Sequence, residues 1–186
     1  MALSTALPSL TACYSSNVDT LEATPATGSD LSRSFSEEYR QLARYERDQM
    51  YDWRDATHYS DKGLGAAGGE EVMPNEVESR RLAADKRDEI LAARTDLVRM
   101  IGAGAAADEP RLAGRAQARL DCWMEQQEEG RQATHIAKCR DEFYTTMTEL
   151  RVAMQPQTAS AESAPAIAEL AEPQTFTFYL GFGRDD

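Results

Sequence analysis

The sequence predicts an all-α protein of about five helices that pack as antiparallel hairpins. Apolar residues recur every three or four positions through most of residues 30–154, which is the period of an amphipathic helix. Glycine and proline residues interrupt this pattern at intervals, as turns between helices do. The chain has 186 residues, of which 41% are hydrophobic and 28% charged, and this length suits one helical domain with tails.

The charge balance is acidic, with 32 Asp and Glu against 20 Lys and Arg and a net charge of -12. Nucleic-acid binding relies on a Lys and Arg footprint, so this balance argues against a nucleic-acid partner. The acidic residues are spread along the predicted helix faces and are not gathered in a tail. This distribution indicates a solvated helical surface.

An uncharged segment, residues 1–12, precedes Cys13. Leu10, Thr11 and Ala12 followed by that cysteine fit the bacterial lipobox, in which a diacylglyceryl group is attached to the thiol and cleavage occurs just before it. We expect residues 1–12 to be a signal peptide and Cys13 to be the lipidation site. The alternative is an ordinary N-terminal segment with an unmodified cysteine.

Residues 13–29 are rich in Ser, Thr, Pro and Gly, a composition typical of a flexible tether. The sequence therefore predicts a lipidated tether that leads to a helical domain over residues 30–154. Tyr14 occupies the position at which Asp favours retention of lipoproteins in the inner membrane, so it indicates the outer membrane. Acyl chains anchor a protein without a spanning helix, at about 0.8 kcal/mol per buried CH₂.

Two helices are expected between residues 30 and 67. The first begins after a Ser29 cap, and the second ends at Gly68-Gly69. The apolar positions of the first are Phe35, Tyr39, Leu42, Met50 and Trp53. Those that share one side of the second are Trp53, Ala56, Tyr59, Gly63 and Ala66. The small residues of the second set allow a neighbouring helix to approach closely.

A third helix is expected over about residues 76–101. Its sparse apolar stripe comprises Leu82, Ile90, Leu97, Val98 and Ile101. Residues 102–110 are a break rich in Gly and Ala. A fourth helix then extends to about Glu129, and a fifth covers about residues 133–154.

The last two helices form the best-defined hairpin, because Gly130 leaves only a short turn between them. Their facing positions are Ala116, Leu120, Trp123 and Gln127 on one helix, and Ile136, Cys139, Phe143, Met147, Leu150 and Met154 on the other. Cys122 lies eight residues before Gly130, and Cys139 lies nine after it. At about 1.5 Å per residue both cysteines reach the same height, which predicts a Cys122–Cys139 disulfide.

The sequence leaves two alternatives to a disulfide for these cysteines. Cys122, His135 and Cys139 include the residue types of a zinc site, with Asp121 as a conceivable fourth ligand. The cysteines could also be free buried thiols. Paired cysteines in exported chains are usually bridged, so we favour the disulfide and expect no metal and no cofactor.

The C-terminal residues change in composition. Residues 155–175 are rich in Pro, Ala, Ser, Gln and Glu and are interpreted as a linker. The alternating aromatic run Phe176–Phe182 predicts one β-strand, which lacks a partner in a helical domain. Residues 176–186 therefore look like the beginning of a second domain.

No set of catalytic residues is evident, and we do not expect an enzyme. His58 and His135 belong to different helical pairs, and no Ser or Cys stands in a recognisable nucleophile motif. Glu46, Asp52 and Asp55 could gather as a carboxylate cluster, which we interpret as a solvated helix face.

Several stretches of the chain form a recognisable set. They are Tyr51–Ala56, Lys62–Leu64, Arg115–Ala118, Leu120–Glu129 and His135–Arg140 with Phe143. This set resembles the N-terminal region of alphaproteobacterial OmpA-family outer-membrane lipoproteins, over about residues 10–154. The resemblance implies a lipoprotein on the periplasmic face of the outer membrane, with a helical region that holds two cysteines.

In that family a Pro- and Ala-rich linker leads to a C-terminal peptidoglycan-binding domain. Phe176–Gly183 resembles the first strand of that domain, but Gly181 and Gly183 stand where the family has Asp. The Asp and Arg that grip peptidoglycan have no counterparts in this sequence. The resemblance therefore implies two partners, outer-membrane lipid through Cys13 and an envelope protein, but no direct peptidoglycan binding by this chain.

The sequence thus favours a non-catalytic outer-membrane lipoprotein whose helical domain has a structural or partner-binding role. The alternative is a soluble tetratricopeptide-like adaptor that binds a peptide or helix of a partner. This alternative depends on a pattern that is similar to tetratricopeptide helical pairs, formed by Trp53, Ala56, Tyr59, Gly63 and Ala66.

Overall fold

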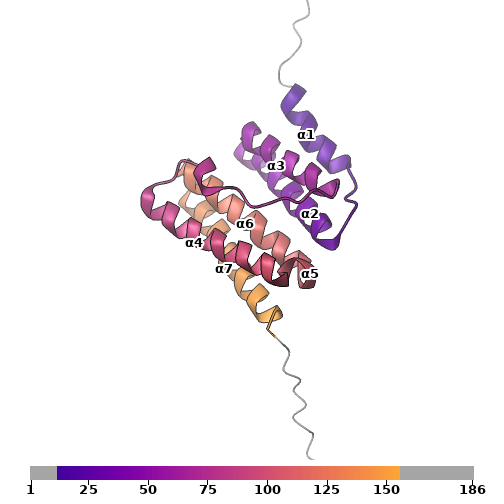
Figure 1. Ribbon diagram of the computed structural model, residues 1–186. Coiled ribbons are helices and arrows are strands. Elements are labelled where there is room, and N and C mark those ends of the chain that lie inside the picture. The colour runs from indigo at the N-terminus through magenta and orange to yellow at the C-terminus, as the bar shows by residue number, and fades with distance from the viewer. Residues whose placement is uncertain (1–11, 156–186) are drawn as a thin grey trace, which may run out of the picture. The chain divides into compact units, whose positions relative to one another are not determined.

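The computed structural model describes residues 12–155, and their side chains from residue 17 onward. This part of the chain is helical and contains no strand, which confirms the all-α prediction (Figure 1). Its α-helices are α1 (Ala12–Ala23), α2 (Asp30–Tyr45), α3 (Trp53–Ala67), α4 (Ala84–Met100), α5 (Ala106–Asp108), α6 (Pro110–Glu129) and α7 (Ala133–Ala153). Outside the described residues lie residues 1–11 of the expected signal peptide. The expected linker and strand after Gln155 also lie outside them.

α2 and α3 form an antiparallel hairpin, and each helix begins with a side-chain cap. Ser29 Oγ accepts a hydrogen bond of 3.1 Å from a backbone N–H in the first turn of α2, so the predicted cap is present. The Asp52 carboxylate accepts from the backbone N–H groups of Arg54 and Asp55 and caps α3. Both caps come from residues next to the helix in the sequence, so they fix where each helix begins.

α6 is the central helix of the fold, with α2, α4 and α7 packed around it (Figure 1). Leu120 and Trp123 of α6 are fully buried, and the Trp123 ring centroid lies 6.1 Å from that of Phe143 in α7. The predicted apolar face of α7 is confirmed, since its buried residues include Cys139, Phe143, Met147 and Leu150. Gly130, with a φ of 68°, ends α6 and allows the tight turn into α7.

The N-terminal segment corrects the prediction of a flexible tether over residues 13–29. Ala12–Ala23 is a helix, and its Val18 and Leu21 are fully buried. Leu21 packs so closely on Gly63 of α3 that a Cβ at that glycine would lie 2.6 Å from it. The Ser and Thr content suggested a tether, but two apolar residues three positions apart give this helix a face to bury.

The third predicted helix begins later than expected, at Ala84. Residues 70–83 contain no α-helix and only a short 3₁₀ turn, at Val77–Ser79. A side chain of α6 holds this segment by its backbone, because Gln117 Nε2 donates to the Val72 carbonyl at 2.7 Å. These two residues are 45 positions apart, so helical periodicity could not reveal the contact.

Two smaller predictions also need correction. The expected break at residues 102–110 contains a π-helical turn, Ile101–Ala105, followed by α5. The chain changes direction there at Gly104, whose φ is 113°. Trp53, expected on a buried helix face, is 43% exposed at the beginning of α3, although Ala56 and Tyr59 are buried as predicted.

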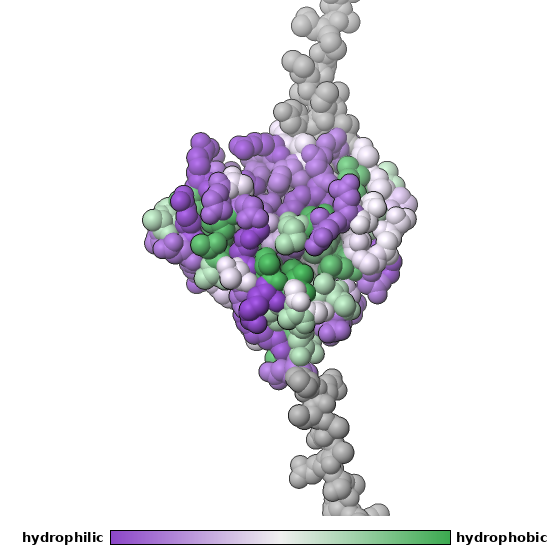
Figure 2. Space-filling model, in the orientation of Figure 1, coloured by the Kyte–Doolittle hydropathy of each residue, from purple (hydrophilic) through white to green (hydrophobic). Residues whose placement is uncertain are grey.

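The surface of the helical domain is varied in polarity. Hydrophilic residues cover much of the face shown in Figure 2, with hydrophobic residues gathered in a smaller area near its centre. The exposed large hydrophobic side chains among the described residues are Tyr51, Trp53, Met73, Leu91, Tyr144 and Val152. None of the described helices has the length and apolar character needed to span a membrane.

Candidate functional site

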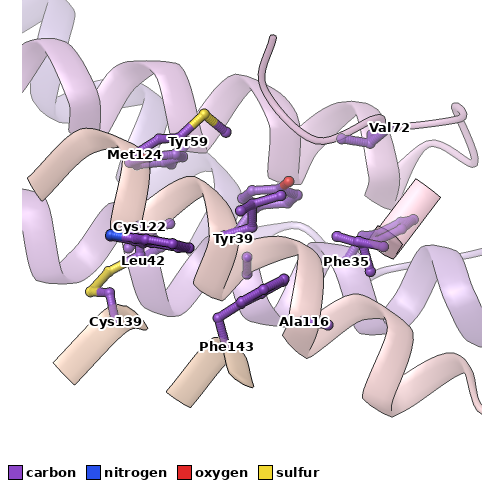
Figure 3. Packing of buried hydrophobic residues seen from close by; sticks show 14 of the residues in the cluster. Phe35, Tyr39, Leu42, Tyr59, Val72, Ala116, Cys122, Met124, Cys139 and Phe143 are labelled. Atoms are coloured by element: carbon purple, nitrogen blue, oxygen red, sulfur yellow. A yellow bond between two sulfur atoms is a disulfide. The ribbon is translucent and has the colours of Figure 1, made fainter. Parts of the chain in front are cut away.

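Cys122 and Cys139 form a disulfide between α6 and α7, as predicted. Their Cα atoms are 5.7 Å apart, and the residues are only 3% and 5% exposed. Figure 3 shows the bridge within the hydrophobic cluster, next to Leu42 of α2. With both sulfurs in the bridge, neither is available as a zinc thiolate.

The other two residues of the zinc alternative have partners elsewhere. Nδ1 of His135 lies 2.8 Å from the Tyr45 hydroxyl. The Asp121 carboxylate lies in the interior, where an ammonium group and two other donors contact it. No group of three or more His, Cys, Asp or Glu residues in the described part of the chain is arranged to hold a metal ion.

A small cavity of about 180 Å³ opens beside the disulfide, between α2, α6 and α7. Its lining includes Leu42, Tyr45, Arg119, His135, Lys138 and Glu142. Arg119 lies between two acids, with its Nε 3.0 Å from Glu142 and its Nη2 3.5 Å from Glu38. Small-molecule sites usually exceed about 300 Å³, so this cavity is too small for a typical ligand.

A second group of polar residues surrounds Asp121, which is fully buried at the centre of the fold. Its Oδ2 accepts hydrogen bonds from the Tyr39 hydroxyl at 2.8 Å and from the Lys62 ammonium at 2.5 Å. Its Oδ1 accepts from the backbone N–H of Asn75 at 2.8 Å. A buried carboxylate is costly unless it is both paired and hydrogen-bonded, and Asp121 has both kinds of partner.

Neutral polar groups extend the network around Asp121. Asn75 Oδ1 accepts a second hydrogen bond from Lys62, at 2.9 Å. Gln117 Nε2 donates to the Tyr39 hydroxyl at 3.0 Å. Burial, and after it the charge of Asp121, raises the pKa of Tyr39 well above its usual value, so the phenol stays neutral and donates to the carboxylate.

A second ion pair joins residues 70–83, the segment before α4, to two helices. Arg80 Nη2 lies 2.5 Å from Asp55 of α3, and Nη1 lies 3.2 Å from Glu128 of α6. The Arg80 side chain is 9% exposed. Burial alone would lower the pKa of Arg80, but the hydrogen bond to Asp55 and the neighbouring charges raise it above its usual value. The guanidinium therefore stays charged and links the segment before α4 to α3 and to α6.

Two further acids lie in the core without a cation partner. Glu46 is fully buried, and neither of its carboxyl oxygens has a hydrogen-bond partner among the described residues. Glu125 of α6 is 1% exposed, and one of its oxygens accepts from Gln126 Nε2 at 2.6 Å. Burial and the nearby Glu125 carboxyl raise the pKa of Glu46 to about 9, and burial raises the pKa of Glu125 to about 8. Burial therefore favours the neutral, protonated form of both carboxyls.

The interpretation of Glu46, Asp52 and Asp55 as a solvated helix face is wrong for two of the three. Glu46 is fully buried and Asp55 is 6% exposed. Distant residues surround them, since Glu125 raises the pKa of Glu46 and Arg80 binds Asp55. Asp52 has a local role, as the cap of α3.

Three of the stretches that carry the family resemblance meet at these ion pairs. They are residues 51–56, 62–64 and 120–129. The sequence alone reveals neither Lys62 nor Arg80 as an ion-pair residue. No local pattern marks either residue, because Lys62 lies 59 positions from Asp121 and Arg80 lies 25 from Asp55.

The two histidines contact different parts of the domain. Nε2 of His58 lies 3.0 Å from the Asn75 side-chain oxygen, beside the Asp121 network. His135 contacts Tyr45 at the cavity beside the disulfide. The expectation that this chain is not an enzyme stays a prediction.

The predicted lipidation site lies at the beginning of the described chain. Ala12 is the first residue of α1, and Cys13 follows it. Leu10 and Thr11 lie outside the described residues. Lipidation of Cys13 therefore stays a prediction.

Together, these contacts define an all-helical domain that is held together by a buried disulfide and by buried ion pairs. Comparison of the chain with models of protein families, with curated proteins and with solved structures finds no match. The OmpA-family resemblance therefore also stays a prediction.

Proposed function

We propose that this chain is a non-catalytic lipoprotein of the bacterial cell envelope, anchored to the periplasmic face of the outer membrane by lipid on Cys13. Its helical domain serves a structural role or binds an envelope protein. The lipobox residues Leu10, Thr11 and Ala12 before Cys13 support the anchor. The OmpA-family resemblance of the helical region supports the compartment.

The observation that carries this proposal is the Cys122–Cys139 disulfide in the core. Disulfides persist in oxidising compartments such as the periplasm and are rare in the cytosol. Both cysteines belong to the same hydrophobic cluster as Trp123 and Phe143. Buried in this way, the bridge supports a structural role in an exported domain.

The position of α1 supports an anchor close to the domain. Asn17 donates to the Asp61 carboxylate of α3 at 2.9 Å, and Val18 is fully buried. Three residues separate Cys13 from Asn17. Lipid on Cys13 would therefore hold the helical domain at the bilayer surface.

The polar interior supports a non-catalytic role. Lys62 and Asp121 are bound to each other and to neighbouring polar groups, and Asp121 is fully buried. Catalytic groups must meet a substrate in a pocket, whereas these side chains already bind one another. The network therefore contributes to stability and specificity of the fold.

A soluble tetratricopeptide-like adaptor is the second candidate. The feature that favours it is the antiparallel hairpin of α2 and α3, in which the Tyr39 and Tyr59 rings stack with centroids 6.2 Å apart. Such an adaptor would bind a peptide or helix of a partner and would carry no lipid.

Metabolic labelling with palmitate in a bacterial host tests the anchor. We expect the wild-type protein to incorporate palmitate and to fractionate with the outer membrane, and Cys13→Ser to lose both properties. The double variant Cys122→Ala/Cys139→Ala is a matched control, because it removes two cysteines but keeps the lipobox. Unlabelled wild-type protein in the cytoplasmic fraction would contradict the lipoprotein and favour the adaptor.

A further inference from the structure

The turn between α2 and α3 exposes two aromatic side chains that the core does not use. Tyr51 is 73% exposed and Trp53 is 43% exposed. We call Tyr51–Trp53 the aromatic turn. Large aromatic residues usually bury most of their surface, so two exposed ones only two positions apart at one turn suggest a contact outside the domain.

The backbone of the aromatic turn holds Tyr51 outward at a cost in conformational energy. Its φ of 56° is in the left-handed region, where a bulky residue is uncommon. Its backbone N–H donates to Glu46 and ends the π-helical turn Glu46–Met50. The Tyr51 side chain has no hydrogen bond or ring contact with any other described side chain. Strain of this kind, held without a packing gain, is typical of a functional position.

Contacts of α1 with α2 and with the π-helical turn after it place the aromatic turn at the end of the domain where α1 begins. Arg47 Nη1 lies 2.8 Å from Asp19, and Arg44 Nε lies 2.9 Å from Glu22. Arg44 belongs to α2 and Arg47 to the π-helical turn that continues it, so later residues of α1 pair with earlier residues of this helical run. The two helices are therefore antiparallel (Figure 1). The beginning of α1, which carries Cys13, and the end of α2, which leads to Tyr51, lie at the same end.

Exposed basic residues flank the aromatic turn. Arg54 follows it directly and is exposed. The turn between α6 and α7 reaches the same place, because Gln132 Nε2 lies 3.8 Å from Met50 Sδ. The Arg131 side chain of that turn is 80% exposed and lies 3.8 Å from the Glu129 carboxylate, so it forms a loose surface ion pair. Arginine side chains at a membrane surface bind lipid phosphates.

We propose that the aromatic turn inserts into the headgroup region of a phospholipid bilayer and sets the orientation of the domain on the membrane. Tyr and Trp favour this region, because an apolar ring with one polar group suits the boundary between water and hydrocarbon. The inference rests on the proposed anchor, since lipid on Cys13 would bring this end of the domain to the bilayer. Helix geometry places Cys13 only about 6 Å along the axis from Asn17.

Chemical coupling to vesicles tests the proposal apart from bacterial lipidation. With Cys122 and Cys139 bonded, Cys13 is the remaining cysteine of the three, so the purified full chain couples through it to a maleimide phospholipid. The vesicles contain phosphatidylethanolamine and phosphatidylglycerol, with or without brominated acyl chains. We expect Trp53 emission to shift to shorter wavelength on coupling and to lose intensity with brominated lipid.

Two controls assign the signal. Trp123 is fully buried and should not respond, so Trp53→Phe should abolish both changes. A second chain, Cys13→Ser/Gln155→Cys, is tethered from the end of α7, away from the aromatic turn. Its Trp53 should keep the emission of the free protein.

The outcomes separate the two proposals. Unchanged Trp53 emission after coupling through Cys13 would overturn the bilayer contact and leave the aromatic turn as a surface for a protein partner. Equal quenching from either tether would overturn the proposed orientation. Failure of palmitate labelling, with quenching intact, would remove the Cys13 anchor but not the affinity of the aromatic turn for lipid.

Discussion

The ammonium of Lys62 lies 2.5 Å from the carboxylate of Asp121, and this contact joins α3 to the central helix α6. Asp121 is completely buried, and the Lys62 side chain is 13% exposed. The carboxylate is costly to bury and relies on all of its donors, including Tyr39 and the backbone of Asn75. The pair therefore controls how the first hairpin packs on the second.

Asp121→Asn should strongly destabilise the domain. The amide keeps the shape of the side chain but leaves the Lys62 charge in the interior without its counter-ion. Removing one partner of a buried pair typically costs about 3–5 kcal/mol. Urea unfolding should show this as a lower midpoint. Asp85→Asn is the control, since Asp85 is 74% exposed and 3.6 Å from Lys86; equal midpoints for the two variants would contradict the prediction.

Stability should fall as the pH rises from about 4.5 to about 9, because of Glu46 and Glu125. Burial raises the pKa of both carboxyls above their value of 4.5 in the unfolded chain. Between pH 4.5 and their folded pKa values of about 9 and about 8, the folded state binds more protons than the unfolded state. The stabilising contribution of each protonated carboxyl is complete below pH 4.5. It falls by about 1.4 kcal/mol per pH unit above that, until the pH passes the folded pKa of the group.

Glu46→Gln should flatten this pH dependence, because the amide does not titrate. The measurement is the free energy of unfolding in urea at several pH values from acid to alkaline. Glu78→Gln serves as the control, since Glu78 is exposed and its replacement should leave the slope unchanged. A slope in Glu46→Gln as steep as in the wild type would show that Glu46 is not the titrating group.

Opening the Cys122–Cys139 bridge should cost about 3 kcal/mol, given that 17 positions separate the cysteines. The double variant Cys122→Ala/Cys139→Ala and the reduced wild type should both show the loss in thermal or urea unfolding. Non-reducing mass spectrometry should find the two cysteine peptides linked. Equal stability of oxidised and reduced protein would contradict a stabilising role.

Gly114→Ala should destabilise the contact between α6 and α2. A Cβ at Gly114 would lie 2.2 Å from Ser34 Oγ and 2.9 Å from Ser34 Cβ, and overpacking of this kind costs about 1–3 kcal/mol. Gly102→Ala is the matched control, because no atom lies within 4 Å of a Cβ there. It should raise stability by up to about 1 kcal/mol. The prediction fails if both alanines have the same effect on the unfolding midpoint.

Tyr51→Gly should raise stability although it deletes a large side chain. Glycine adopts the φ of 56° found here without the strain of about 1 kcal/mol or more that a bulky residue incurs. Tyr51→Ser removes the ring but keeps the strain, so it should be nearly neutral. A lower melting temperature for Tyr51→Gly would show that the ring stabilises the domain.

The α6–α7 hairpin could be predicted from the sequence, including its cysteine pair. Gly130 fixes a short turn, and helical geometry then determines which residues face each other. The interior charges could not be predicted in the same way. Asp121 meets Lys62 and Tyr39 across 59 and 82 positions, and such contacts leave no periodic trace.

α1 and the segment before α4 show why composition can mislead. The Ser- and Thr-rich residues near Cys13 favour a tether by composition, but burial of Val18 and Leu21 stabilises a helix. Residues 76–83 resemble the start of a helix, yet only Val77–Ser79 form a short 3₁₀ turn, and Arg80 after it has an extended backbone and binds Asp55. In both places tertiary contacts override local preference.

Because α1 is packed into the domain, it also determines how a mechanical load would enter the protein. A force applied at the beginning of α1 acts on Val18 and Leu21 in the core and on the Asp19–Arg47 ion pair. It would therefore pass directly into α2 and α3, without first extending a slack segment. Movement of the attachment point would rotate or lift the whole helical body.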